Sequence, residues 1–434
     1  MRRSTLFALA LAALAPATAS ATNLRIALKT DDGDYVVAQN GGGAELAADR
    51  SERGAWETFT LYDIDGGALE HGDQVALRAA DGHFVSAEGG GGRELVANRD
   101  RAQSWERFVI HRDGGNGTVD DGSKISLQSA SRKFLSARGG SLKADLDVIT
   151  GGNERFRVVV VDRMKHAKLS APFAKPSDFS APIGFDHNRD KHKSPTSCTG
   201  FYGEGFPNCY DNHEGTDYML KGWFPGMDLR KNEVIAAAPG IVIGIADGNA
   251  DHCFAFPSKA KGEWDLAEHQ IQCPGNPELE ANVVSILQDD GDIARYYHLK
   301  KGSVVVGDGQ RIECGMTLGL VGSSGVSSSP HLHFQLERDD AWIDPYKVDA
   351  WAKLKDKVPQ RTCNAPAAPA TPGQQMCNVV ERVFSCSNQP AKAICDGVQS
   401  VTGGCIAKDW SGKCITTCAD VCGTIERTVT KPCG

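Results

Sequence analysis

The chain has 434 residues and a formal net charge of −8 at pH 7. Because it is acidic and has no basic cluster, it is poorly suited to binding a polyanion, and nucleic acid is excluded as a partner. It contains 14 cysteines, of which none precedes Cys198 and eight lie between Cys377 and Cys433. This uneven distribution indicates several unlike modules, and the number of cysteines fits an oxidising compartment.

Residues 1–21, MRRSTLFALALAALAPATASA, combine two arginines, an apolar stretch and a small-residue end. This pattern predicts a secretory signal peptide that is cleaved after Ala21. A membrane anchor is the competing interpretation, but the apolar stretch is short for a bilayer, and no later segment is apolar over enough residues to span one. We therefore expect a secreted protein, extracellular or periplasmic, with no membrane span, and a monomer.

Three related copies fill residues 22–162, with a period of 48 to 50 residues. The second copy, VALRAADGHFVSAEGGGGRELVANRDRAQSWERFVI, matches IALKTDDGDYVVAQNGGGAELAADRSERGAWETFTL, and the third is ISLQSASRKFLSARGGSLKADLDVITGGNERFRVVV. The equivalent positions are Leu28, Leu77 and Leu127; Tyr35, Phe84 and Phe134; Ala38, Ala87 and Ala137; and the stretches 57–59, 106–108 and 154–156. A period of this length accommodates four short strands with glycine-rich turns, and three such units are expected to close into one barrel.

The stretches G-x-Y/F-V-x-A and W-E-x-F make residues 23–162 similar to the β-trefoil of the fascin and actin-crosslinking superfamily. The resemblance implies a trefoil fold and a glycan or protein ligand, although a fold does not by itself establish a function. We predict that Phe59, Phe108 and Phe156 belong to the barrel core, because aromatic side chains are mostly buried. Trp56 and Trp105, which precede the paired glutamates, are left unassigned.

Composition divides the rest of the chain into four further segments. Residues 163–195 are rich in proline, serine and mixed charge and are expected to form a linker that enters the next domain. Residues 196–352 are expected to form a globular domain, followed by a Pro/Ala-rich linker at 353–375. Residues 376–434 have few large apolar residues, which predicts a disulfide-rich module. Zinc is the alternative there, but the segment has no histidine and no CxxC pair.

The globular domain contains a candidate catalytic and metal-binding set: His213, Asp217, His298, His331 and His333. In SSSPHLHFQLE the two histidines of HLH would point to one face of a strand, while Leu332 and Phe334 point to the other. His213 and Asp217, in NHEGTDY, are four residues apart and share a face on a strand or a helix. Imidazole and carboxylate groups are ligands suited to Zn²⁺. The spacing leaves open whether HLH supplies one ligand or two.

The order and flanks of these motifs resemble the lysostaphin-like, LytM-type zinc endopeptidases, metallopeptidase family twenty-three, over about residues 178–348. The matching blocks are HEGTDY, NEVIAAAPGIVIGIADG, YYHL, VVVGDGQRIECGMTLGLVGSSG and SSSPHLHFQ. The resemblance implies an antiparallel β-sheet metallopeptidase domain, so that the chain as a whole is mainly β. It implies that His213, Asp217 and His333 hold Zn²⁺, about one ion per chain.

The same resemblance implies that His298 and His331 are the catalytic histidines, and it leaves open which of them is the base. Three protein ligands would leave zinc a fourth position for water, whose pKa zinc lowers towards about 7. The implied substrate is peptidoglycan, at its cross-bridges or stem peptides, or a glycine-rich protein or peptide.

Two insertions depart from the family pattern, at residues 219–232 and 251–273, and are expected to form walls of the cleft. We expect a disulfide between Cys253 and Cys273 and another that closes the segment 198–209. His252 and His269 are interpreted as solvated loop residues. Two alternatives remain open: a non-catalytic cell-wall or glycan-binding adhesin that uses the trefoil and the tail, and an enzyme whose trefoil is an inhibitory pro-segment.

Overall fold

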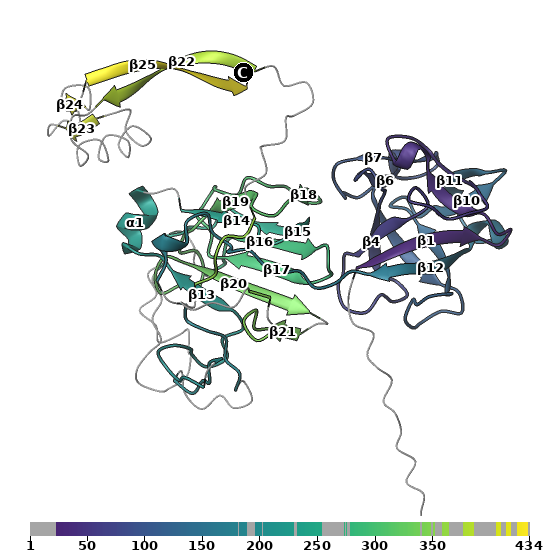
Figure 1. Ribbon diagram of the computed structural model, residues 1–434, viewed down its shortest axis with the longest axis horizontal. Coiled ribbons are helices and arrows are strands. Elements are labelled where there is room, and N and C mark those ends of the chain that lie inside the picture. The colour runs from purple at the N-terminus through teal and green to yellow at the C-terminus, as the bar shows by residue number, and fades with distance from the viewer. Residues whose placement is uncertain are drawn as a thin grey trace, which may run out of the picture.

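The computed structural model describes residues 23–180, 182–188, 196–201, 203–229, 232–253, 273, 275, 278–338, 341–348, 350–351 and 358–363, and strands between 376 and 432. The described chain is mainly β (Figure 1). In this part of the chain, no helix is long and apolar enough to cross a membrane. The predicted signal peptide and His269 lie outside the described residues.

The N-terminal unit, here named the repeat domain, spans residues 23–163 and forms one sheet of 12 strands. The strands are β1 (Leu24–Thr30), β2 (Tyr35–Ala38), β3 (Leu46–Arg50), β4 (Phe59–Asp63), β5 (Gln74–Arg78), β6 (Phe84–Ala87), β7 (Leu95–Arg99), β8 (Arg107–Arg112), β9 (Lys124–Gln128), β10 (Phe134–Arg138), β11 (Ser141–Leu146) and β12 (Phe156–Arg163). The 3-10 helices are η1 (Gln39–Gly41), η2 (Glu88–Gly90) and η3 (Gly152–Glu154). Each repeat contributes four strands, and β1 pairs antiparallel with β12, which joins the first repeat to the last.

Residues from all three repeats share one buried core in the repeat domain. Phe59, Phe108 and Phe156, at equivalent positions of the repeats, are fully buried, which confirms their predicted place in the core. Complete burial of a phenylalanine side chain contributes roughly 1.5–3 kcal/mol relative to exposure. The three equivalent aromatic residues therefore give each repeat a similar share in stabilising the domain.

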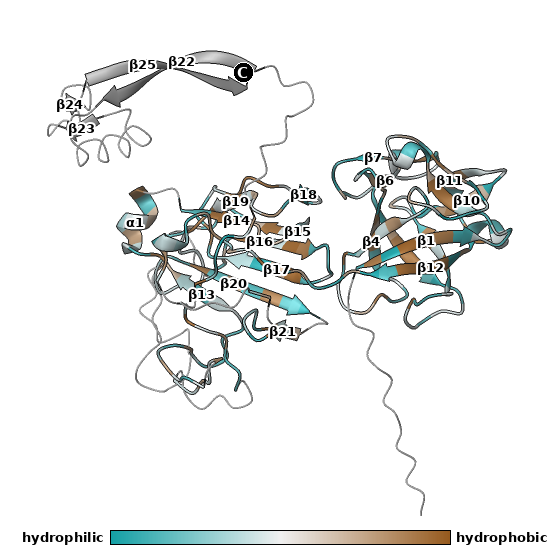
Figure 2. Ribbon diagram, in the orientation of Figure 1, coloured by the Kyte–Doolittle hydropathy of each residue, from teal (hydrophilic) through white to brown (hydrophobic). Residues whose placement is uncertain are grey.

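The second unit, here named the sheet domain, is built on a seven-stranded antiparallel sheet. Its strands are β13 (Thr216–Met219), β15 (Gly240–Ala246), β16 (Val283–Gln288), β17 (Ile293–Tyr297), β18 (Arg311–Ile312), β20 (His331–Arg338) and β21 (Ala341–Ile343). Their order is β13-β20-β17-β16-β15-β18, with β21 paired to β20. A separate pair, β14 (Glu233–Ile235) with β19 (Thr317–Leu320), and the helices η4 (Pro176–Asp178) and α1 (Trp223–Leu229) complete the domain. Figure 2 shows hydrophobic residues concentrated on the central strands β15 and β16.

The segment at 163–195, predicted to be a linker that enters the next domain, contributes residues from its described part, 163–180 and 182–188, to the core of the sheet domain. Leu169, Ala171 and Phe173 alternate along it and are buried. Its backbone is hydrogen-bonded to the domain, since the amides of Leu169 and Ser170 donate to the carbonyls of Ala350 and Ala237, at 2.7 and 2.8 Å. An irregular but extended segment can thus be buried, because the surrounding chain satisfies its polar backbone groups.

Residues 358–363, the described part of the second predicted linker at 353–375, also contact the sheet domain. Cys363 forms a disulfide with Cys314, and the amide of Thr362 donates to Oγ of Ser170 at 3.0 Å. Residues 358–363 therefore belong with the sheet domain in the structure. In the tail, β22 (Met376–Ser385) pairs with β25 (Gly423–Pro432), and β23 (Cys405–Lys408) pairs with β24 (Cys414–Thr417). The predicted tail disulfides fall outside the described side chains.

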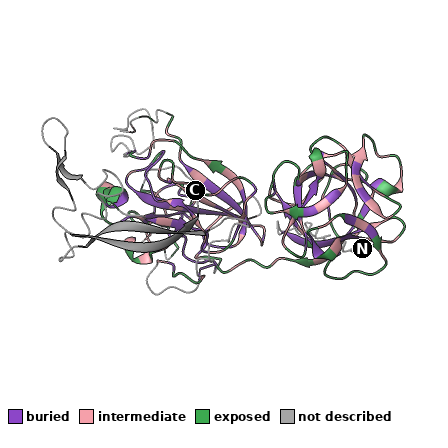
Figure 3. Cartoon of the chain, turned by 90° about the horizontal axis from the view of Figure 1, so that it is seen from above, coloured by how far each residue is buried: buried purple, intermediate pink, exposed green. Residues whose placement is uncertain are grey.

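The repeat domain and the sheet domain meet at a buried junction, and Figure 3 shows the two units side by side. The junction cluster consists of Tyr62, Ala76, Phe84 and Ala102 from the repeat domain and Ile241, Leu287 and Ile293 from the sheet domain. Polar contacts surround it: the Tyr62 hydroxyl donates to Oδ1 of Asp289 at 2.7 Å, and Arg311 binds both carboxylate oxygens of Asp289.

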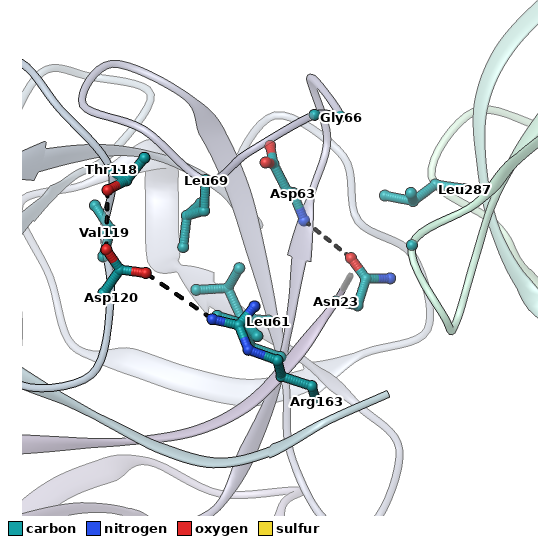
Figure 4. Close-up of a pocket in the computed structure, with 13 residues that line it drawn as sticks. Asn23, Leu61, Asp63, Gly66, Leu69, Thr118, Val119, Asp120, Arg163 and Leu287 are labelled. Carbon is teal, nitrogen blue, oxygen red and sulfur yellow. Dashed lines mark hydrogen bonds and ion pairs between the residues drawn. The ribbon is translucent and has the colours of Figure 1, made fainter. Parts of the chain in front are cut away.

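A small cavity of about 20 Å³ lies between the two domains at this junction (Figure 4). Asp63 lines it and is 7% exposed. Among the described residues, no side chain is hydrogen-bonded to the Asp63 carboxylate. Burial, followed by the nearby charges of Asp73 and Asp65, raises the pKa of Asp63 to about 8. Burial therefore favours the uncharged form of this carboxyl group where the two domains join.

Candidate functional site

Three neighbouring strands bring the predicted site residues together at one end of the seven-stranded sheet. In the antiparallel register, Asp217 of β13 lies opposite His333 of β20, and Tyr297 of β17 lies opposite His333 on the other side. Side chains directly opposite in an antiparallel pair are about 4.5–5.5 Å apart at Cβ, which explains why a carboxylate and an imidazole from distant parts of the sequence meet. On the other face of β20, Leu332 and Phe334 are fully buried, as the alternation predicts.

His213, Asp217 and His333 place three potential metal ligands within 4.8 Å of one another. Asp217 Oδ1 lies 2.8 Å from His333 Nδ1 and 3.2 Å from His213 Nε2, and the two imidazole nitrogens are 3.2 Å apart. Ligands at zinc distances of about 2.0–2.2 Å in a tetrahedral arrangement are roughly 3.3–3.6 Å apart, which is close to this spacing. The set of two nitrogens and one oxygen is one that Zn²⁺ accepts.

The outer hydrogen bonds of the two histidines determine which nitrogen faces the centre of this group. His213 Nδ1 donates to the Gly184 carbonyl at 2.7 Å, so its Nε2 carries the lone pair. His333 Nε2 donates to Gln335 Oε1 at 3.1 Å, so its Nδ1 carries the lone pair. Three acceptor atoms consequently face one point, an arrangement that a bound cation would satisfy. Hydrogen bonds of this kind orient histidine ligands in metal sites.

Asp217 is buried and held in its ionised form. Burial alone would raise the pKa of its carboxyl group, but interactions with His213 and His331 lower that pKa to well below its usual value. The Tyr210 hydroxyl donates to Asp217 Oδ2 at 3.2 Å, and the Tyr210 ring stacks on His213 with centroids 4.1 Å apart. Tyr210 therefore orients two of the three candidate ligands and leaves Oδ1 of Asp217 directed towards the histidines.

His298 and His331 lie beside the candidate ligands, and the centroids of their two rings are 4.5 Å apart. His331 Nδ1 donates to the Ser329 carbonyl at 2.7 Å, and His298 Nδ1 donates to the Ser324 carbonyl at 2.6 Å. Each ring thus has Nε2 available for proton transfer, and His331 Nε2 is 3.5 Å from Asp217 Oδ1. Burial, with contributions from His331 and His333, lowers the pKa of His298 to well below its usual value, which keeps its ring neutral.

A buried carboxylate organises the loop that leads into His213. Asp186 is completely buried and accepts hydrogen bonds from the backbone amides of Asn188, Thr199 and Asn212, at 2.9, 3.0 and 3.0 Å. The amide of Asp186 donates to the His213 carbonyl at 2.8 Å. The disulfide between Cys198 and Cys209, which the sequence predicted, closes the same loop. These contacts position His213 from outside the regular sheet.

The two insertions contact each other next to the site. His252 stacks on Phe224 of α1 with centroids 5.6 Å apart, and its Nε2 lies 3.1 Å from Asp228 Oδ1. The predicted disulfide from Cys253 to Cys273 is present, and the amide of Cys253 donates to the Ser323 carbonyl at 2.9 Å. The second insertion is therefore connected to the chain immediately before Ser324, the residue that anchors His298. The side chain of His252 is half-exposed, as expected for a loop residue.

A second group with metal-ligand chemistry, His166, Asp290 and Asp292, lies away from this site. Arg338 donates to both carboxylate oxygens of Asp292, at 2.8 and 2.6 Å. Because the guanidinium group already neutralises this carboxylate, the group functions as an ion-pair network. The structure thus brings together all five predicted site residues in one place and separates them from this second group.

Sequence reasoning missed the residues that orient the site, namely Tyr210, Gln335, Ser324 and Ser329. Tyr210 stands three residues before His213, and Gln335 two residues after His333, so both lie within the quoted motifs or next to them. Their contacts depend on the fold, because Tyr210 reaches Asp217 and Gln335 reaches the outer nitrogen of His333. Only the period of a strand, which puts residues 333 and 335 on one face, could have indicated the second contact.

Residues 270–345 match the family described as Peptidase family M23. This range contains His298, His331 and His333, while His213 and Asp217 precede it. Over 55 residues the chain is 44% identical to glycyl-glycine endopeptidase ALE-1 of Staphylococcus capitis and 42% identical to lysostaphin of Staphylococcus simulans. These alignments cover 12% of this chain and only 15% and 11% of the relatives' own length.

Solved structures similar to parts of the chain include the catalytic domain of lysostaphin from Staphylococcus simulans, with a TM-score of 0.23 and 18% identity. That similarity covers 40% of this chain and 95% of the lysostaphin domain. The SDF2-like protein from Arabidopsis thaliana is similar with a TM-score of 0.28 and 9% identity, over 33% of this chain and 95% of that protein.

Proposed function

We propose that this protein is a secreted zinc endopeptidase of the M23 type that hydrolyses peptide bonds in peptidoglycan cross-bridges or stem peptides, or in glycine-rich proteins. The observation that carries the proposal is the convergence of three acceptor atoms from His213, Asp217 and His333 beside His298 and His331. The match of residues 270–345 to Peptidase family M23 supports it independently. We further propose that the repeat domain is a β-trefoil, that the tail is a disulfide-rich module, and that the protein is a monomer.

The hydrogen bonds described above support different roles for the residues of the proposed site. His213, Asp217 and His333 would hold zinc, which when bound supplies Lewis-acid activation of a water molecule and of the substrate carbonyl. Asp217 contributes the negative charge of the ligand set, and Tyr210 and Gln335 hold the ligands in orientation. Three protein ligands leave a position open, as catalytic zinc sites require.

His298 and His331 are the proposed proton-transfer groups. Their Nδ1 protons are bound to backbone carbonyls, so each Nε2 can accept a proton from the attacking water and return it to the leaving amine. After it gains a proton, the same Nε2–H can donate a hydrogen bond to the developing oxyanion. A general acid–base histidine contributes typically 10²–10⁴-fold to a rate.

The glycyl-glycine endopeptidase from Staphylococcus capitis supports a glycine-containing substrate, because its name states the bond that it cleaves. The disulfides between Cys198 and Cys209 and between Cys314 and Cys363 support an oxidising location outside the cytosol. Peptide cross-links of a cell wall lie in such a location. We therefore favour peptidoglycan over a soluble glycine-rich protein as the substrate.

The test compares His333→Ala with His331→Ala and His298→Ala in the full chain. His333→Ala should lower zinc affinity steeply, because it removes one of three ligands. The other two variants should keep about one zinc per chain and lose roughly 10²–10⁴-fold in turnover. Bound zinc after dialysis and cleavage of a glycine-containing peptide are measured on the same samples, after folding is checked by circular dichroism.

Two results would contradict the proposal. Zinc loss in His331→Ala together with retention in His333→Ala would reverse the roles within the histidine pair. A wild-type protein that binds zinc but releases no fragments from purified cell walls, as judged by mass analysis of muropeptides, would favour a non-catalytic wall-binding adhesin instead.

A further inference from the structure

Two tryptophan side chains are exposed at equivalent positions of the first and second repeats. Trp56 is 45% exposed and Trp105 is 42% exposed. Among the described residues of the repeat domain, the only other large hydrophobic side chain that is exposed is Val148. Exposure of an isolated apolar side chain is common, but the same indole at the same place in two repeats is a repeated surface feature.

A glycine supports each indole ring. A Cβ atom at Gly41 would lie 3.0 Å from Cδ1 and Nε1 of Trp56, and one at Gly90 would lie 3.4 and 3.3 Å from the same atoms of Trp105. Both glycines have positive φ, +84° and +80°, which a larger residue would adopt with strain. The ring edges are therefore seated closely against the backbone while much of each ring remains exposed to solvent.

Charged and polar side chains lie around the Trp105 indole, and the first repeat has an equivalent arginine. Arg99, which lines the surface around Trp105, donates to Glu88 Oε1 at 2.6 Å, and the equivalent Arg50 donates to Gln39 Oε1 at 3.1 Å. At Trp105 the surface forms a shallow depression of about 450 Å³, lined by Arg99, Asp100, Gln103 and Ser104 among others. The depression thus offers one aromatic face and a rim of hydrogen-bonding groups.

The third repeat has the same scaffold without the aromatic side chain. Glu57, Glu106 and Glu154 are buried in all three repeats and accept the amides of Gly54, Gln103 and Gly151, at 2.7, 3.0 and 2.7 Å. At the position before this glutamate the third repeat has Asn153. The glutamate therefore maintains the loop in every repeat, whereas the tryptophan is not needed to form it.

We propose that Trp56 and Trp105 form two binding sites for the glycan strand of the cell wall; this inference deepens the proposed function and rests on it for the identity of the polymer. A pyranose ring has an apolar face that can stack on an indole and a rim of hydroxyl groups that can bond to arginine, aspartate and glutamine. Protein interfaces have a contiguous apolar core, which a single indole rimmed by polar groups lacks. Two equivalent sites also suit a polymer of repeating units, since simultaneous binding raises the overall affinity.

The position of the second site connects glycan binding with the sheet domain. Next to Trp105, the amide of Ala102 donates to the Gly309 carbonyl at 2.8 Å, and Arg107 binds both oxygens of Asp308 at 2.9 and 3.0 Å. In Figure 1, β6 and β7 lie on the side of the repeat domain that faces β15 and β18. A strand bound at Trp105 would lie beside the domain that carries the proposed catalytic site.

The experiment measures binding of the full chain, with zinc removed by a chelator, to two insoluble probes: peptidoglycan glycan strands freed of peptides, and chitin. Trp56→Ala and Trp105→Ala should each weaken binding to the glycan strands about tenfold or more, and the double variant should lose more than either. Asn153→Ala, at the equivalent position of the third repeat, and Val148→Ala, at the other exposed apolar side chain, should bind like the wild type. Equal binding to chitin would indicate recognition of the sugar backbone in general, and preference for the peptidoglycan strands would indicate recognition of the cell-wall polymer.

A second measurement separates this inference from the proposed function. With zinc restored, all of these variants should hydrolyse a small soluble peptide at the wild-type rate, because none of the substituted residues belongs to the site on the sheet domain. Absence of hydrolysis in the wild type with intact glycan binding would refute the endopeptidase alone. Wild-type binding of glycan strands by the double tryptophan variant would overturn the inference. Binding of the protein to cell walls that depends on wall proteins, and that is lost in the tryptophan variants, would overturn the inference in favour of a protein partner.

Discussion

Gln335 lies behind the proposed metal ligand His333 and decides which of its nitrogens carries a proton. It is 6% exposed, and its Oε1 accepts a hydrogen bond from His333 Nε2 at 3.1 Å. Gln335→Ala removes this acceptor and should lower zinc affinity about 10–100-fold, the usual effect of losing such a partner. Competition with a chromophoric chelator measures the affinity directly, without reference to catalysis.

Gln335→Glu is the matched control, because a carboxylate at the same place also accepts the Nε2 proton. It should retain most of the wild-type zinc affinity. If Gln335→Ala binds zinc as tightly as the wild type, the orientation of His333 does not depend on this hydrogen bond, and the assignment of Nδ1 as the ligand atom loses its support.

At the scale of single residues, the sequence predicted the groups with ionisable or metal-binding chemistry better than the groups that orient them. His213, Asp217 and His333 were indicated by the order of motifs that resemble the metallopeptidase family, and the structure places them within 4.8 Å of one another. Tyr210 has no such pattern, since stacking on His213 arises from the path of a loop.

The segment 358–363 contacts the sheet domain at a distance from the rest of that domain in the sequence. Gln360 accepts the Ala171 amide at 3.0 Å through its carbonyl, and Cys363 is linked to Cys314 across 49 residues of sequence. A disulfide that closes a loop of this length stabilises the folded state by typically 2–4 kcal/mol. A variant ending at residue 364 should therefore unfold at a similar denaturant concentration to the sheet domain of the full chain, whereas one ending at 352 should be clearly less stable.

Urea unfolding of the two truncated proteins, with hydrolysis of a soluble peptide as the second measurement, tests this expectation. The double variant Cys314→Ser/Cys363→Ser in the full chain separates the disulfide from the other contacts of the segment. Equal stability of the proteins ending at 352 and 364 would show that the segment adds nothing to the sheet domain.

At the scale of elements, regular patterns were predictable and irregular ones were not. The repeats predicted four strands each, and the structure has β1–β4, β5–β8 and β9–β12 in the three copies. The proline- and serine-rich segment at 163–195 was expected to be a linker that enters the next domain, and its composition did not indicate that Leu169 and Phe173 would lie in the core. Composition describes the average polarity of a segment, whereas burial depends on partners such as Ala350 that lie far away in the sequence.

At the scale of the whole molecule, the junction contains a titratable group whose charge opposes folding. The pKa of Asp63 is raised to about 8, chiefly by burial, whereas an unfolded aspartate has a pKa of about 3.9. Below about pH 4 the Asp63 carboxyl group is protonated in both the folded and the unfolded protein, so it does not reduce the free energy of unfolding. Between about pH 4 and pH 8 only the unfolded state loses its proton, so stability should fall by up to about 1.4 kcal/mol per pH unit, and no further above pH 8.

Asp63→Asn, which keeps the shape of the neutral acid, should remove this part of the pH dependence and stabilise the protein near pH 8. Asp162→Asn changes the net charge equally at an exposed position and serves as the control. Chemical denaturation from pH 5 to pH 9 provides the comparison. If Asp63→Asn leaves the dependence of the free energy of unfolding on pH unchanged, the carboxyl group is ionised, or solvated, in the folded protein.

Phe84 shows what the junction means for the folding of each half of the protein. Its equivalents Tyr35 and Phe134 are partly exposed, but Phe84 is fully buried, with Tyr62 beside it at a ring-centroid distance of 5.9 Å. Expressed without the sheet domain, the repeat domain would present this pair to water as an apolar patch, and patches of that kind promote aggregation. During synthesis the repeat domain emerges first, so the interval before the sheet domain is complete is when the chain is least soluble and most dependent on chaperones.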